Sequence, residues 1–239
     1  MRKGQVVIMK KILFLASLVL FGALAPSFAI EEPPYNRELP KGGIQEAPQK
    51  EDIYIDNDTY KKYKKISKDD KIIQAIETMK GSLGDYSRRA ILGENLTGRP
   101  VKVEFRDLSL LNEAYRDFDA LGWKQKNQLY IFINQKHFDA PKEALAAVLS
   151  HEAIHQDELN SINEETYCWT LEAAVWTDFT EKNPELENIN HPLVVRENTI
   201  KRLFIKGDYT DKYIRKSVMS NAGYQTLPSR SPGFEDENL

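Results

Sequence analysis

The chain has 239 residues, with 33 basic and 36 acidic side chains and a net charge of −3 at pH 7. This acidic balance argues against nucleic acid as a partner, because binding to phosphates needs a surplus of lysine and arginine. The single cysteine excludes an intramolecular disulfide, so an apolar core must stabilise the fold, and the length suffices for one such domain.

Residues 1–29 have the pattern of a secretory signal peptide. Four basic residues precede an apolar stretch over 12–23, and the small residues up to Ala29 suit cleavage after about that position. The stretch is shorter than the ~20 residues of a membrane span, and no second one follows, so we expect no membrane span after cleavage. The mature protein is then exported, either periplasmic or secreted, with 29 basic against 36 acidic residues.

Residues 30–52 are rich in Pro, Glu, Lys and Gly and have no apolar period, which predicts a flexible leader. The leader contains no cysteine or histidine, so it cannot act as a metal-binding latch of the thiol type. Residues 53–226 carry the periodic apolar positions and form the expected domain.

Within this domain the patterns predict an α+β fold, mostly helical with a small β-sheet. Residues 72–79 follow a helical period that Gly81 ends, and a second short helix covers 86–92. The alternating residues 101–105 and the apolar residues 129–134 predict two strands. The second strand directly precedes the most informative segment of the chain.

That segment is His151-Glu152-Ala153-Ile154-His155. Residues four apart on an α-helix share one face about 6 Å apart, so two imidazole nitrogens can reach one tetrahedral cation. Glu152 then stands beside the cation and is free to act as a base. We expect one helix over 142–156, with Asp139 capping its free amides and Pro141 in its first turn.

A catalytic zinc ion takes three protein ligands and keeps its fourth position for water, so one more donor is needed. The next predicted helix begins with Ser161 as N-cap and Glu164 three residues later, a capping box that gives Glu164 a structural task. Glu165 and Glu172 share an inward face of this helix with two tryptophans, so both are candidate ligands. Two antiparallel helices place residues about 169–172 level with the metal, which favours Glu172.

The motif Glu165-Thr166-Tyr167-Cys168 completes a resemblance to the gluzincin branch of zinc metallopeptidases, in which Glu-x-x-small follows His-Glu-x-x-His on the next helix. The resemblance implies a zincin-like fold and a zinc ion (Zn2+) bound by His151, His155 and Glu165. Glu172 ranks second as the third ligand, and Glu164 ranks third.

The resemblance covers about residues 129–176. The small residue of the second motif lets the two helices approach, and Cys168 fills that place as a small buried side chain. An aspartate often follows it in the family and orients a zinc-bound histidine. This chain has Trp169 there, and Glu172 one turn further on is the candidate for that task.

The resemblance implies a zinc metallopeptidase, in which zinc lowers the pKa of its bound water toward ~7, Glu152 takes the proton and the hydroxide attacks a peptide carbonyl. Substrates would be peptides or proteins, with cell-wall peptides suggested by export. Two alternatives remain: a non-catalytic zincin-shaped binding or assembly protein, and a zinc hydrolase acting on cell-wall amide bonds.

The C-terminal part is less informative. Two short helices are expected over 192–224, covering the helices of the site, and residues 227–239 are expected to be a flexible tail. A second imidazole or a tyrosine usually stabilises the oxyanion in such sites. The sequence does not rank the candidates for this role, which are His191, Tyr167, Tyr209, Tyr213 and Tyr224.

Overall fold

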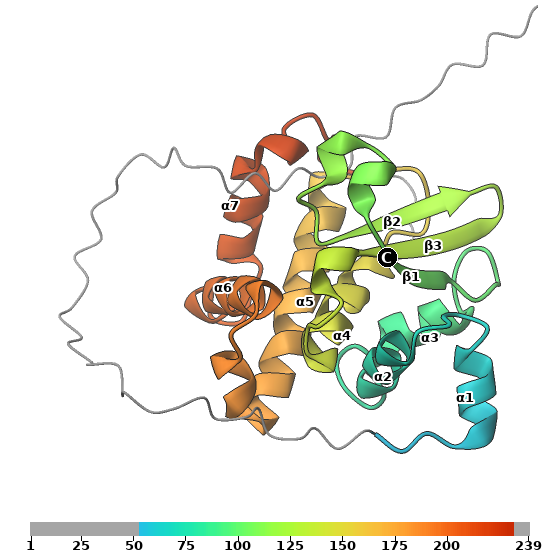
Figure 1. Ribbon diagram of the computed structural model, residues 1–239. Coiled ribbons are helices and arrows are strands. Elements are labelled where there is room, and N and C mark those ends of the chain that lie inside the picture. The colour runs from blue at the N-terminus through green and yellow to red at the C-terminus, as the bar shows by residue number, and fades with distance from the viewer. Residues whose placement is uncertain (1–52, 232–239) are drawn as a thin grey trace, which may run out of the picture.

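The computed structural model describes residues 53–231, so the predicted signal peptide, the leader and residues 232–239 lie outside the described part of the chain. In the described part, seven α-helices and one three-stranded sheet form a mixed α+β fold, as predicted (Figure 1). None of the helices between residues 53 and 231 is long and apolar enough to span a membrane.

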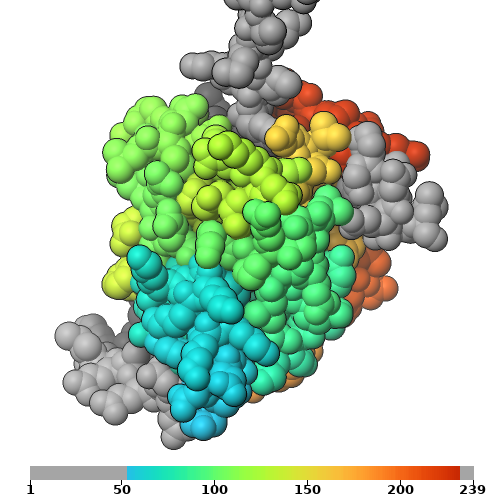
Figure 2. Space-filling view, turned by 90° about the vertical axis from the view of Figure 1, so that its right-hand side faces the viewer, coloured from blue at the N-terminus to red at the C-terminus, as the bar shows by residue number. Residues whose placement is uncertain are grey.

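The N-terminal helices are α1 (Asn57–Tyr63), α2 (Asp70–Thr78) and α3 (Asp85–Leu92). Helix α2 begins where the Asp69 carboxylate accepts hydrogen bonds from two backbone amides of the first turn. It ends before Gly81, whose φ of +70° lies in the left-handed region. Helices α2 and α3 confirm the two helices predicted here, and Figure 2 shows these segments, in blue and green, forming one continuous face.

The sheet consists of β1 (Lys102–Arg106), β2 (Ala120–Gln125) and β3 (Gln128–Asn134). Strand β3 is central, parallel to β1 and antiparallel to β2. β1 and β3 confirm the two predicted strands, whereas β2 was not predicted. Its alternation is weak because Gly122 interrupts it, and within the described chain β2 pairs on one side only.

The remaining helices are α4 (Lys142–Glu152), α5 (Ile162–Lys182), α6 (Pro192–Lys206) and α7 (Lys212–Ser220). Helix α5 packs against α4 on one side and against α6 and α7 on the other (Figure 1). The two predicted C-terminal helices are therefore confirmed and cover α5. Three alanines of α4 have no exposed surface, which allows its close packing: Ala144, Ala146 and Ala147.

Two main apolar clusters lie on either side of α5. The larger one joins the N-terminal helices, one face of the sheet, α4 and α5, and includes Ile76, Ile131 and Leu149. The second joins α5, α6 and α7, and includes Ile200 and Ile214. A third, smaller cluster covers the other face of the sheet. Helix α5 thus carries its polar residues between two apolar cores.

Helix α4 ends at Glu152, so the predicted helix over 142–156 is too long at its C-terminal end. The Gln156 side chain donates to the Ala153 carbonyl (3.3 Å) and accepts from the Leu96 amide (2.9 Å). Residues 153–154 form a turn, and His155 therefore lies beyond the helix rather than one helical turn along it.

The start of α4 also differs from the prediction. Pro141 is itself the N-cap, and no side chain caps the helix. Asp139 instead lies 3.2 Å from His191 Nε2, at the start of α6. The prediction that Asp139 caps α4 is therefore wrong. Its carboxylate contacts a histidine 52 residues further along the chain instead of the amides of the helix.

Candidate metal centre

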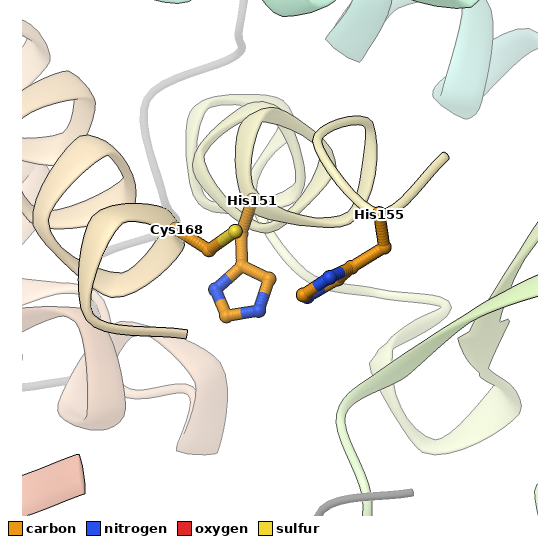
Figure 3. Close-up of side chains that lie close together, drawn as sticks. All are labelled: His151, His155 and Cys168. Atoms are coloured by element: carbon orange, nitrogen blue, oxygen red, sulfur yellow. The ribbon is translucent and has the colours of Figure 1, made fainter. Parts of the chain in front are cut away.

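Two histidines and a glutamate converge where α4 ends and α5 begins. His151 lies in the last turn of α4, His155 in the turn that follows, and Glu165 in the first turn of α5. The Glu165 carboxylate oxygens lie 3.8 Å from His151 Nε2 and 3.7 Å from His155 Nε2. The imidazole rings are 5.2 Å apart at 61° (Figure 3). The structure thus brings together the three residues expected to bind zinc.

The other nitrogen of each imidazole contacts a different glutamate. His151 Nδ1 lies 3.0 Å from Glu172 Oε2, and His155 Nδ1 lies 2.9 Å from Glu164 Oε1. A histidine that binds a metal through one nitrogen usually donates the other N–H to a carboxylate, which fixes its tautomer and orientation. Glu172 and Glu164, the second and third choices as ligand, therefore orient the histidines.

The capping box at the start of α5 forms only in part. Ser161 Oγ accepts from the Glu164 amide (3.1 Å), as predicted. The return bond is absent, because Asn160 Oδ1 already accepts from the Ser161 amide (2.7 Å). The Glu164 carboxylate instead contacts His155 and accepts from Ser231 Oγ (3.0 Å), so its expected bond to the Ser161 amide is wrong.

The donor set fits zinc. Zn–N and Zn–O bonds of 2.0–2.2 Å put neighbouring donors of a tetrahedral site about 3.3 Å apart. The two observed separations, 3.8 and 3.7 Å, are about half an ångström longer and close with a small side-chain movement. Two imidazoles and one carboxylate are also a ligand set typical of catalytic zinc.

Glu152 stands beside this group, at the end of α4. A Cβ at Gly122 on β2 would lie 3.4 Å from Glu152 Oε2 and 3.2 Å from His155 Cβ, so the absence of a side chain there lets the two elements approach. Burial raises the pKa of Glu152, partly opposed by His151 and His155, which makes its carboxylate a stronger base than an exposed one. Gly122 is not among the predicted site residues, although a glycine inside a strand is a signal for such an approach.

Arg196 on α6 is a second residue of the candidate site that the sequence did not indicate. Its guanidinium contacts both carboxylate oxygens of Glu172, and its Nε lies 3.0 Å from Asp119 Oδ2. Burial raises the pKa of Glu172, but Arg196 and His151 together outweigh it and hold the pKa low, so that this carboxylate stays charged next to His151. No spacing in the sequence signals this contact, because the partners lie 24 residues apart on different helices.

The candidates for oxyanion stabilisation are spread over the molecule. His191 is the N-cap of α6 and accepts a backbone hydrogen bond through Nδ1. Tyr224 lies near the centre, since its hydroxyl accepts from Trp169 Nε1 (3.1 Å) and the Trp169 ring is 6.4 Å from that of His151. Tyr209 packs on Phe204.

Comparison with known protein families, with curated proteins and with solved structures found no match. The function is therefore inferred from the residues themselves, and the geometry they offer is a carboxylate between two oriented imidazoles with the Glu152 carboxylate beside them.

Proposed function

We propose that this chain is an exported, zinc-dependent peptidase with a zincin-like site, in which His151, His155 and Glu165 hold the metal and Glu152 is the general base. One observation carries the proposal: the Glu165 carboxylate lies within 3.8 Å of both Nε2 atoms, while both Nδ1 atoms contact other carboxylates. This arrangement leaves one nitrogen of each imidazole for a cation.

A zinc ion in this position supplies a Lewis acid for a water molecule and a peptide carbonyl. The protein supplies the proton transfers. Glu152, with its raised pKa, accepts the proton of the attacking water and then donates it to the leaving amine. Glu172 and Glu164 keep the imidazoles oriented, and Arg196 keeps Glu172 charged.

Strand β2 supports a peptide as the substrate. Within the described chain its outer edge has no partner strand, and Gly122 on this strand lies against Glu152. An extended peptide can add to such an edge through backbone hydrogen bonds, which places a scissile bond beside the base. Peptides of the cell wall remain a substrate class consistent with export.

The test compares Glu152→Gln with the wild-type protein. The variant should retain stoichiometric zinc and lose peptide hydrolysis by about 10²–10⁴-fold, because the amide cannot accept the proton. Glu158→Gln, at an exposed position in the loop that follows, is the control and should change neither quantity. A Glu152→Gln protein that holds zinc and cleaves as fast as wild type would exclude Glu152 as the base.

A second candidate is a non-catalytic protein with a structural metal. Cys168 favours it, because its sulfur lies near the two imidazoles and four-ligand sites containing thiolate are typical of structural zinc. Removal of zinc with a chelator separates the two. Loss of the fold in a protein that never hydrolysed a peptide would support the structural role.

A further inference from the structure

The one cysteine of the chain lies at the metal centre, and the proposed peptidase reaction does not use it. Cys168 is three residues after Glu165 on α5, so the two side chains share one face of the helix. Its side chain has no exposed surface. Figure 3 shows it reaching from α5 toward the imidazoles of His151 and His155.

The Cys168 side chain is buried and lies close to two imidazoles. In the described chain Cys168 belongs to none of the three clusters of buried apolar residues. Its Sγ and one nitrogen from each of His151 and His155 all lie within 4.8 Å of one another. The sulfur therefore faces polar donors, whereas a residue that only lets two helices approach needs no sulfur.

The separations suit a fourth metal ligand. Bonds of about 2.3 Å to sulfur and about 2.0 Å to nitrogen put these donors about 3.5 Å apart in a tetrahedral site. The three atoms lie within 4.8 Å of one another, at most about 1.3 Å more than this, and side-chain rotation can close that difference. With the Glu165 carboxylate, the centre then offers four donors.

We propose, on the basis of the metal site described above, that the Cys168 thiolate is a fourth protein ligand and that the resting centre is closed by two histidines, one glutamate and one cysteine. A thiolate in the fourth position excludes the water that hydrolysis needs, so the resting protein is latent. Hydrolysis requires Cys168 to leave the metal, and the centre prefers metals that accept sulfur ligands.

The test is the absorption spectrum of the full-length protein loaded with Co²⁺. The chain has one cysteine, so a thiolate-to-cobalt charge-transfer band can come only from Cys168. Wild type should show this band together with the d–d bands of a four-coordinate ion. Cys168→Ala and Cys168→Ser should lose it, keep the d–d bands and bind Co²⁺ at least about tenfold more weakly, since each tenfold corresponds to 1.4 kcal/mol.

The zinc-loaded Cys168→Ala protein should also hydrolyse peptides faster than wild type. Thr170→Ser, an equally small change on the same helix, is the matched control and should keep both the band and the wild-type rate. Wild-type protein that shows the d–d bands without the charge-transfer band would overturn the inference and leave the proposed peptidase standing. Wild-type protein that binds neither Co²⁺ nor zinc would overturn the proposed function itself.

Discussion

Three glutamates of α5 face the two histidines, and each contacts different nitrogen atoms. Glu165 lies between the two Nε2 atoms, Glu172 contacts Nδ1 of His151, and Glu164 contacts Nδ1 of His155. The sequence left open whether Glu165 or Glu172 is the third ligand. The two carboxylates differ in the nitrogen they approach: Glu172 contacts Nδ1 of His151, and Glu165 is the one of the two that lies near Nε2 of both histidines.

Single substitutions of these glutamates test the assignment. Glu165→Ala should no longer retain zinc after dialysis, because it removes a ligand. Glu172→Ala should weaken zinc binding by about 10–100-fold, the usual effect of losing a group that orients a ligand. Zinc content and competition with a chelator measure both. Intact zinc binding in both variants would contradict the ligand set.

At the scale of elements, the N-terminus of α5 depends on a segment that is distant in sequence. The carbonyls of Pro228 and Ser229 accept hydrogen bonds from the amides of Ile162 and Asn163 (2.9 and 3.2 Å). These amides lack partners within the helix, so the segment satisfies them. Ser231 is almost fully buried here. Residues 228–231 are therefore bound to the domain, although the composition predicted a flexible tail from 227 onward.

Ser231 extends this contact to the metal centre, because its hydroxyl donates to the glutamate that orients His155. Ser231→Ala should weaken zinc binding by up to about tenfold, since Glu164 loses a partner and holds the imidazole less firmly. Ser229→Ala is the control, because Ser229 is exposed and contributes its backbone carbonyl. Equal zinc affinities of the two variants would show that the segment only covers the helix end.

At the scale of the whole molecule, buried charges tie the sheet to the helices. Asp119, which precedes β2, lies 2.6 Å from His137 Nε2 and 3.0 Å from Arg196 Nε. Arg196 in turn contacts Glu172 on α5. Charges in a protein interior are stabilising only when each has a partner, so the loss of one leaves the others uncompensated. These charged side chains thus link the sheet to α5 and α6, the elements around the candidate metal centre.

This network predicts a pH dependence of stability. Burial raises the pKa of Asp119, but the hydrogen bond with His137 and the charges of Arg196 and Lys136 outweigh it and hold the pKa well below its usual range. A carboxylate with a lowered pKa stabilises the fold fully above its unfolded-state pKa of about 3.9, and this contribution is lost as the pH falls through the folded-state value.

Asp119→Asn should therefore lower the free energy of unfolding of the metal-free protein by about 2–3 kcal/mol at pH 7. The difference in the free energy of unfolding between this variant and wild type should shrink as the pH falls from 5 to 3. Urea denaturation at each pH measures it. Asp58→Asn, which removes an exposed ion pair with Lys61, is the control and should change stability by under about 0.5 kcal/mol. A difference for Asp119→Asn that stays constant over this pH range would contradict the role of its charge.

The sequence by itself determined most elements, because helical and strand periods depend on local burial. It predicted α2, α3, α5, α6, α7 and the strands β1 and β3, it predicted α4 with an end that is too late, and it placed two imidazoles and a carboxylate within five residues. Only the tertiary structure decided where α4 ends, that β2 exists beside Glu152, and which glutamate meets both imidazoles. The physical reason is that these features depend on partners far along the chain. The contacts of Gln156 with Leu96 and of Glu172 with Arg196 leave no trace in local spacing.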